Sequence, residues 1–164
     1  MYYGQAIKQV IDWYIETLGN TTIENNIISM QIALETLSYV ILVEQEKVLS
    51  DEDFDRNLSS TNIRMLLHSC KIPIGKEELY LFDEYIQHKF LDGVDLITYF
   101  RNKIVHPSRK RNRATLHVED MWNIIQIAIR YVELVLLHLI GYKGEYSNRL
   151  KERSYGEVEL VPWN

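Results

Sequence analysis

The chain has 164 residues, of which 46% are hydrophobic, and this length suits one globular domain with a buried core but not two. Its net charge of −5 argues against binding of nucleic acid by overall charge and leaves room only for a local basic patch. The single cysteine, Cys70, excludes an internal disulfide bond and is typical of a reducing compartment.

The first ten residues, MYYGQAIKQV, contain neither the basic region nor the apolar region of a secretory signal. The most apolar stretch, YVELVLLHLIGY, is interrupted by Glu133 and His138 and is too short to span a bilayer. We therefore expect a soluble cytoplasmic protein that does not enter a membrane. Helical periodicity begins almost at once, at Ala6, Val10 and Trp13, and from this we expect the domain to be the C-terminal part of a longer protein.

Apolar residues spaced three and four apart predict helices along most of the chain, which has only three prolines and seven glycines. Helices are predicted at residues 3–18, at 22–46, in a short segment after Ser60, and at 76–90, 94–106 and 116–142. A capping box formed by Thr21 and Glu24 is expected to start the second of them. The sequence thus predicts an all-α fold. Residues 1–142 would form an antiparallel bundle of about five to six helices, and residues 143–164 a polar tail packed on it.

Basic residues are concentrated in one short window, between Arg101 and Arg113, where no acidic residue occurs. The window contains six of them, namely Arg101, Lys103, Arg109, Lys110, Arg111 and Arg113. Subtracting six from the net charge of −5 leaves −11 for the rest of the chain. Such segregation favours phosphate binding, because an acidic protein would direct an RNA or a nucleotide to this one face. The alternative is a solvated loop that neutralises neighbouring acidic helices.

One histidine, His106, lies inside this window, four residues after Asn102 and directly before Pro107. Asn102 and His106 share a helix face, whereas Arg101 and His106 are about 140° apart around a regular helix. Pro107 relieves this separation, because the residue before a proline is driven out of the α conformation and the helix must end near His106. The imidazole is then expected to reach the same cleft as the Arg101 guanidinium.

The three side chains of Arg101, Asn102 and His106 suit phosphoryl chemistry. A histidine moves protons near neutral pH. An arginine holds a phosphate and stabilises the added charge of a phosphorane, and an asparagine orients either group. Together they would assist attack of an RNA 2′-hydroxyl on the adjacent phosphate, a reaction that needs no metal. The alternative is a histidine at a helix C-terminus that interacts with the helix dipole. His117 fits the same loose spacing after Arg111, but we expect it to be an N-terminal residue of the last helix.

At FRNKIVHP the sequence resembles the HEPN superfamily of small helical nucleotide-binding and ribonuclease domains. The family signature is an arginine, a polar residue such as asparagine, and a histidine four to six residues after the arginine. Arg101, Asn102 and His106 match it, and a proline after the histidine is also common in the family. The segments ALETLSYVILVE and GYKGEYSNRL, with VPW near the end, further resemble the C-terminal HEPN domains of ApeA-like abortive-infection proteins.

The resemblance implies a metal-independent endoribonuclease that acts as a toxin or an anti-phage defence effector. It implies no cofactor, and a homodimer whose two motifs share one cleft. The implied substrate is RNA, with tRNA as one candidate class. An antitoxin or an N-terminal sensor domain is an expected partner. The 164 residues include no such sensor domain, so the resemblance leaves regulation open, and some HEPN domains are inactive and only bind nucleotides or partners.

Two further residues are candidates for supporting roles. Glu35 is the only charged residue in MQIALETLSYVILV, and a carboxylate in so apolar a segment needs a partner. It would orient Arg101 or Asn102, or simply lie at the edge of the hydrophobic seam. Tyr99 would either stack on a base or pack in the core.

The remaining site residues are expected to act through charge. Lys103 and the basic residues between Arg109 and Arg113 would hold phosphates that flank the scissile one. Asp51, Glu52 and Asp53 do not share a helix face, and no residues have the spacing of metal ligands, so no metal is expected.

Three hypotheses follow for the function. The first is a HEPN ribonuclease with Arg101, Asn102 and His106 as its catalytic residues. The second is a non-catalytic module that uses the same basic face to bind a nucleotide, RNA or a partner protein. The third is a structural dimerisation bundle, in which replacing His106 would have no effect.

Overall fold

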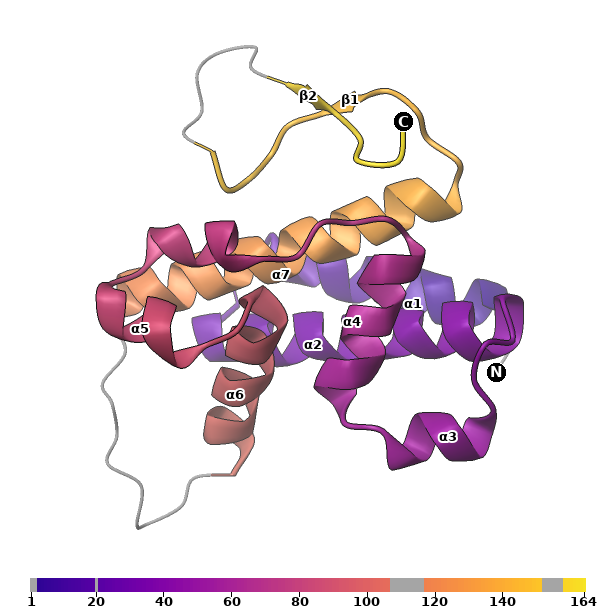
Figure 1. Cartoon of the computed structure of the whole chain (residues 1–164), viewed down its shortest axis with the longest axis horizontal. Helices are drawn as coiled ribbons and strands as arrows, with labels where there is room; N and C mark the ends of the chain where they lie inside the picture. Colours follow the sequence, from indigo (N-terminus) through magenta and orange to yellow (C-terminus); the bar gives the residue numbers. More distant parts are fainter. Residues whose placement is uncertain (1–2, 20, 107–116, 152–157) are drawn as a thin grey trace.

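The computed structural model describes residues 3–19, 21–106, 117–151 and 158–164, and within these ranges the fold is almost entirely helical (Figure 1). The prediction of an all-α helical bundle is confirmed. The described residues form more helices than expected, because two predicted helices are divided and because residues 51–56, which form α3, were not among the predicted helices. In chain order the elements are α1 (Tyr3–Thr17), α2 (Ile23–Tyr39), the π-helix η1 (Val40–Gln45), α3 (Asp51–Arg56), α4 (Ser59–Ser69), the 3-10 helix η2 (Lys76–Leu81), α5 (Glu84–Lys89), α6 (Gly93–Val105), α7 (Val118–Leu139), β1 (Glu145–Tyr146) and β2 (Glu159–Leu160).

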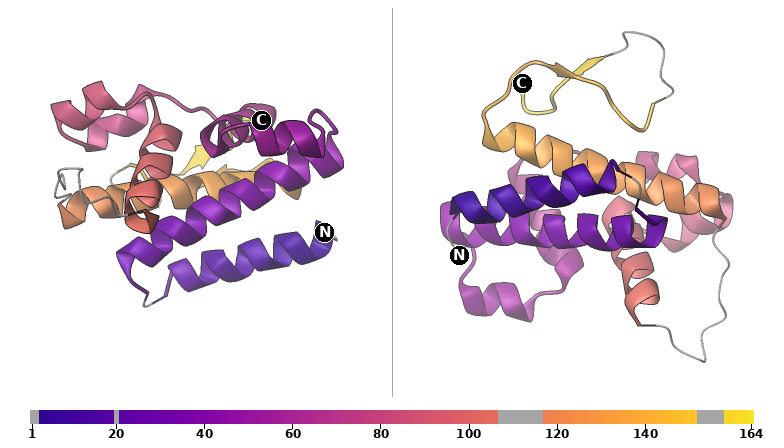
Figure 2. Two further views of the ribbon diagram at one scale, coloured as in Figure 1. Left: turned by 90° about the horizontal axis from the view of Figure 1, so that it is seen from below. Right: turned by 180° about the vertical axis from the view of Figure 1, so that it is seen from behind.

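The central element is α2, which contacts α1, α4, α6 and α7. Helix α1 lies beside α2 along its length, and α4 and α6 cross α2 steeply (Figures 1 and 2). In two of these helices the apolar residues spaced three and four apart form rows in the core. The buried rows are Ile27, Met30, Leu34 and Leu37 of α2, and Ile125, Ala128, Val132 and Val135 of α7. Burial of these rows against each other is the main force that holds the helices in place.

The two ends of α2 differ from the expected ones. Thr22 caps the helix, because its Oγ1 accepts a hydrogen bond from the Asn25 backbone N–H at 3.4 Å. The hydroxyl of Thr21 instead donates to the Asn26 side chain, so the predicted capping box is wrong by one residue. At the other end the helix continues past Tyr39 as η1, and the predicted extent of residues 22–46 is nearly reproduced.

The predicted helix at residues 76–90 is divided, which corrects the expectation of one continuous helix. Phe82 is extended, and the Asp83 carboxylate caps α5 by accepting a hydrogen bond from the Ile86 backbone N–H at 2.9 Å. An aspartate competes in this way with helix continuation. Leu79, Phe82 and Ile86 are nevertheless all buried.

A buried carboxylate, Glu78, connects η2 to α7. The Arg130 guanidinium donates to it at 2.9 Å, and the Tyr131 hydroxyl donates to its second oxygen. Burial raises the pKa of Glu78, although Tyr131 and Arg130 act in the opposite direction. Gly93, the first residue of α6, lies against this cluster, and an added Cβ would come within 2.7 Å of the Tyr131 hydroxyl. The cluster therefore fixes the point from which α6 begins.

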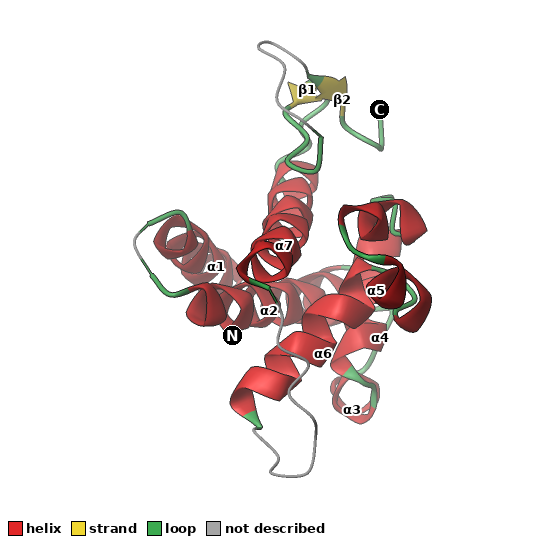
Figure 3. Cartoon of the chain, turned by 90° about the vertical axis from the view of Figure 1, so that its left-hand side faces the viewer, coloured by secondary structure: helices red, strands yellow, loops and turns green. Residues whose placement is uncertain are grey.

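The C-terminal segment packs on α7, as expected, but it is not only polar surface. Strands β1 and β2 pair antiparallel above α7 (Figure 3). Tyr146 and Val161 are buried, and the Trp163 indole donates to the Tyr142 carbonyl at 2.7 Å. Arg149 anchors the segment by hydrogen bonds to both carboxylate oxygens of Glu133 at 2.9 Å. The two short strands were missed because neither has the length of a detectable alternating pattern.

Two helical stretches, Ile23–Gln45 and Val118–Leu139, have the length and the apolar composition of membrane spans. In each stretch, 61% of an apolar 18-residue window is buried inside the bundle, and core helices of soluble proteins pass the same test. The absence of a membrane and the cytoplasmic location therefore stay predictions.

Candidate functional site

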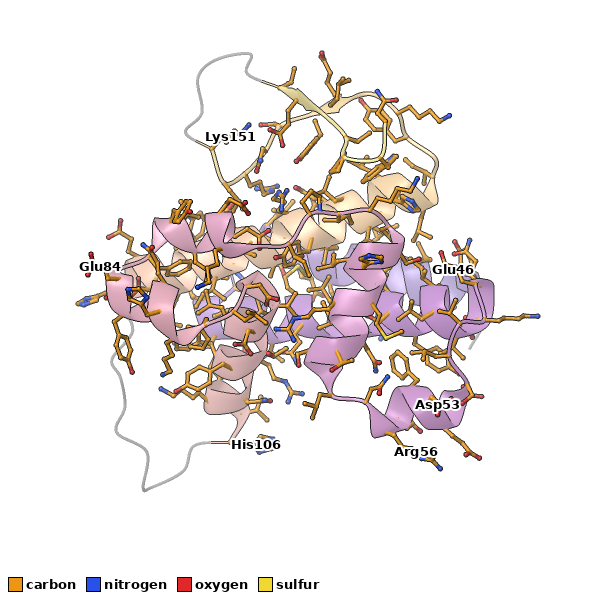
Figure 4. The ribbon with its side chains drawn as sticks, viewed as in Figure 1. Glu46, Asp53, Arg56, Glu84, His106 and Lys151 are labelled. Carbon is orange, nitrogen blue, oxygen red and sulfur yellow. The ribbon has the colours of Figure 1, made fainter. Side chains whose placement is uncertain are left out.

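Arg101, Asn102 and Lys103 lie on α6 and His106 is its C-terminal cap, and the N-terminal end of this helix is firmly held. The Asp92 carboxylate caps the helix by accepting from the Asp95 backbone N–H at 2.8 Å. The Arg64 guanidinium donates two hydrogen bonds, of 2.7 and 3.0 Å, to the same carboxylate. Val94, Ile97 and Phe100 are buried, and the helix packs against α2 and α7. This anchoring leaves the C-terminal end of α6 pointing away from α7, with His106 at its tip (Figure 4).

Arg101 is half-buried on the flank of α6 and has no acidic partner among the residues that the structure describes. Its Nη1 donates to the Asn102 side-chain oxygen at 3.2 Å, and its Nε–H is buried without a hydrogen-bond partner. The other four arginines within the described ranges are paired: Arg56 with Glu52, Arg64 with Asp92, Arg130 with Glu78 and Arg149 with Glu133.

A half-buried arginine with an unsatisfied N–H and no acidic partner among the described residues is suited to bind an anion. A buried N–H with no acceptor costs about 1 to 3 kcal/mol, and a phosphate oxygen would relieve that cost. The guanidinium fork matches two phosphate oxygens at once. The chain has 23 acidic residues, so the lack of a carboxylate here does not reflect a shortage of acids.

His106 is the C-terminal cap of α6 and has left the helical conformation, with φ of −120° and ψ of 72°. A residue before a proline is expected to leave the α region, and the prediction that the helix ends here is confirmed. The His106 backbone N–H still donates to the Asn102 carbonyl at 3.0 Å. Its imidazole is exposed and makes no hydrogen bond to any described residue. The ring is therefore accessible to a ligand but is not oriented by a neighbouring group in this part of the chain.

The structure joins Arg101 to Asn102 directly, and Asn102 to His106 through the backbone. No hydrogen bond connects the side chains of Arg101 and His106 in the described structure, in keeping with their offset of five residues. Whether the two face a common cleft stays a prediction.

Tyr99 and Lys103 form a second group on the same helix, together with Lys89 at the end of α5. The Lys89 ammonium donates to the Tyr99 hydroxyl at 3.1 Å and lies 4.4 Å from the ring centroid. The Lys103 ammonium lies 4.9 Å from the same centroid. Burial alone would raise the pKa of Tyr99, but the two ammonium groups outweigh it and the pKa is lowered.

Lys89 was not expected at the site from the sequence. It lies ten residues before Tyr99, in a different element, and only the turn between α5 and α6 brings the two together. The edge-on contacts of the Tyr99 ring with Phe90 and Phe100 hold this arrangement. No local spacing rule would have revealed it.

Glu35 does not make the contact proposed for it. Its carboxylate accepts a hydrogen bond from the Gln31 side chain at 2.8 Å, and no hydrogen bond or ion pair to Arg101 or Asn102 occurs among the described residues. The hydrogen-bond partner that the Glu35 carboxylate needs is thus Gln31, one turn earlier on α2. This contact favours the second of the two predicted roles, a position at the edge of the hydrophobic seam.

The remaining candidates, Arg109, Lys110, Arg111 and Arg113, lie outside the described residues, as does Pro107. Their contribution rests on the sequence alone. His117 caps α7 together with Asp120, which confirms its expected place at the start of the last helix. Within the described ranges no group of three or more His, Cys, Asp or Glu side chains is arranged to hold a metal ion.

Comparison with known proteins gives the family. Residues 1–160 match the sequence model described as the YopA C-terminal domain. The chain belongs to this family. It is 31% identical over 164 residues to the SPbeta prophage-derived uncharacterized protein YopA of Bacillus subtilis strain 168. The match covers 99% of this chain and 36% of that relative, so the chain spans about a third of the length of the relative. No solved structure matches the chain. The resemblance to HEPN domains is a separate matter and stays a prediction.

Proposed function

We propose that this domain is a HEPN-type, metal-independent endoribonuclease in which Arg101 binds the scissile phosphate, His106 transfers protons and Asn102 positions the guanidinium. The observation that carries the proposal is the state of Arg101. It is half-buried, its Nε–H lacks an acceptor, and it alone among the described arginines has no carboxylate partner. A chain with so many acids would pair this guanidinium if its role were structural.

The reaction follows from these groups. The 2′-hydroxyl oxygen attacks the adjacent phosphorus while its proton passes to a neutral imidazole. The bond from phosphorus to the 5′-oxygen breaks, and an imidazolium protonates that oxygen. The products are a 2′,3′-cyclic phosphate and a 5′-hydroxyl. Arg101 stabilises the additional negative charge on the phosphorane between these steps.

Two imidazoles serve this mechanism better than one, because the base and the acid act at the same time. In the proposed homodimer, the tips of two α6 helices meet and each supplies one His106. The exposed position of His106 at the end of α6, directed away from α7, is compatible with such a meeting (Figure 4). In a cell the domain would act as a toxin or a defence effector, and tRNA is one candidate substrate.

Incubation of the purified protein with RNA in excess EDTA tests the proposal. The expected products carry 2′,3′-cyclic phosphate ends, and they disappear with His106→Ala. Expression of the wild type in a bacterial host should be toxic, and expression of His106→Ala should not. Cleavage that requires a divalent ion, or that persists in His106→Ala, would exclude the mechanism.

The alternative is a binding module without turnover. It is favoured by one observation, namely that no described residue orients the His106 ring by a hydrogen bond. In that case RNA binding would be lost with Arg101→Gln, while the wild type would release no product from any RNA tested. A measurement of RNA cleavage therefore distinguishes the two functions, whereas a measurement of RNA affinity does not.

A further inference from the structure

A second pair of cations lies close to the proposed active site and is also unneutralised. The ammonium groups of Lys89 and Lys103 lie 4.4 and 4.9 Å from the centroid of the Tyr99 ring. Neither lysine has an ion pair with any carboxylate among the described residues. Two like charges are therefore held against one aromatic ring, an arrangement that costs energy unless an anion joins them.

The contacts to Tyr99 offset only part of this repulsion. A cation over a tyrosine ring contributes about 0.5 to 1 kcal/mol at an exposed site. Lys89 also donates a hydrogen bond to the Tyr99 hydroxyl. These contacts hold the ammonium groups in place without neutralising them, because the tyrosine hydroxyl is uncharged at neutral pH. The result is two ammonium groups positioned against one ring, neither of which is paired with a carboxylate of the described residues.

Tyr99 and Lys103 lie on the face of α6 that leads to His106, and Lys89, at the end of α5, contacts Tyr99 from the neighbouring helix. Residues 99, 103 and 106 are spaced four and three apart and fall within about 60° around the helix axis. Lys103 is one helical turn from His106, and Asn102, which accepts the Arg101 hydrogen bond, borders the same face. An RNA strand bound at His106 would pass over these lysines.

The same contacts argue against stacking of a base on Tyr99, one of the two roles predicted for this residue. The ring is half-buried, carries the two ammonium groups and meets Phe90 and Phe100 edge-on. Little of the ring surface remains for a base. A phosphate, by contrast, would find two positive charges at this position.

We propose that Lys89, Tyr99 and Lys103 form a subsite for a non-scissile backbone phosphate of single-stranded RNA. The identity of the ligand rests on the proposed function, because it is the RNA substrate that would place this phosphate. The subsite reads the backbone, so it contributes affinity without preference for sequence.

Binding of a labelled single-stranded oligoribonucleotide to proteins carrying His106→Ala tests the subsite in the absence of cleavage. Dissociation constants would be measured between about 50 and 200 mM salt for this parent and for Lys89→Gln, Lys103→Gln and Lys89→Arg in the same background. Lys143→Gln, an exposed lysine after α7, is the matched control.

Each glutamine variant is expected to weaken binding several-fold at the low salt concentration and to reduce the slope of log K against log salt by about 0.7. The loss should be equal for oligonucleotides of different sequence, and Lys89→Arg should retain the parent affinity. Lys143→Gln should change neither quantity.

An unchanged affinity and slope in Lys89→Gln would overturn the subsite, as would a parent that does not bind RNA. The outcome is independent of turnover. If the wild type proves unable to cleave while Lys89→Gln still weakens binding, the catalytic proposal fails and the subsite stands.

Discussion

Arg101 donates a hydrogen bond from Nη1 to the side-chain oxygen of Asn102, its neighbour in the sequence, over 3.2 Å. An asparagine holds the guanidinium without neutralising its charge. An aspartate at the same position would neutralise it. The full positive charge of Arg101 is thus kept for a ligand. This relationship makes residue 102 the most direct control over the electrostatics of the site.

Replacement of Asn102 by aspartate should therefore weaken RNA binding more than replacement by alanine. The new carboxylate would pair with Arg101 and repel the phosphate, and we expect a loss of about tenfold, equivalent to about 1.4 kcal/mol. The free energy of unfolding should hardly change, because Asn102 is exposed. RNA affinity and urea denaturation measure the two effects. Gln5→Glu, which adds the same charge on exposed surface of α1, should leave binding intact, and an equal loss in both variants would contradict the account.

Gly93→Ala should destabilise the fold at the start of α6. The added Cβ would lie 2.7 Å from Ile127 Cγ2 and 2.9 Å from the Glu78 carboxylate, inside a buried cluster. We expect a loss of about 1 to 3 kcal/mol in the free energy of unfolding, measured by urea denaturation. Gly4→Ala is the control, because a Cβ there meets nothing within 4 Å, and stability should hold or rise by up to about 1 kcal/mol. Equal stability of the two variants would show that α6 is not fixed at this point.

Arg149→Gln should loosen the C-terminal segment from α7. Glu133 would lose a partner at 2.6 Å and, among the described residues, would keep the Tyr14 hydroxyl, while its side chain is 21% exposed. A half-buried carboxylate that has lost its guanidinium partner lowers the free energy of unfolding by about 1 to 3 kcal/mol, which urea denaturation would detect. Arg56→Gln removes an exposed pair with Glu52 and should change stability by less than about 0.5 kcal/mol. A similar small change for Arg149→Gln would mean that the segment is held by its apolar contacts alone.

His138 should make stability depend on pH. Burial lowers the pKa of His138 below its ordinary value of 6.5, with a smaller effect in the same direction from Lys71, while Glu46 raises it. Below pH 6.5 the unfolded chain therefore binds more protons than the folded one at this position. The free energy of unfolding should fall as the pH falls from 6.5 through the folded-state pKa.

His138→Gln should remove this part of the pH dependence. Urea denaturation at several pH values, followed by tryptophan fluorescence, provides the comparison, since the His138 ring meets the Trp163 indole edge-on at 5.1 Å. An NMR titration that gave His138 a pKa at or above its ordinary value would refute the prediction.

Long helices could be predicted from the sequence because their apolar spacing is repeated over several turns. The extents of α1, α6 and α7 agree with the expected ranges to within a few residues. The end of α6 at His106 followed from a single local rule, the effect of a proline on the residue before it. The break at Phe82 could not be predicted from such a rule. An aspartate after an apolar residue is common inside helices, and it marks a helix start only where the chain turns.

The residues of the candidate site also differ in whether they could be predicted from local spacing in the sequence. Arg101, Asn102, Lys103 and Tyr99 could be found on the sequence because they lie together on one helix. Lys89 could not, because its contact with Tyr99 depends on the turn between two elements. For Glu35 the sequence left two roles open, because a carboxylate in an apolar segment needs a partner but its identity cannot be read from the sequence, and the contact observed is with Gln31.

The rate of RNA cleavage in excess EDTA by the wild type, Arg101→Gln and His106→Ala tests the central claim most directly. Arg56→Gln, which changes an exposed arginine on α3, is the matched control for loss of one positive charge. The account predicts cleavage by the wild type and by Arg56→Gln, and rates at least about 100-fold lower in the other two variants with their folds intact. Equal rates in all four proteins, or no cleavage of any RNA by the wild type, would contradict it.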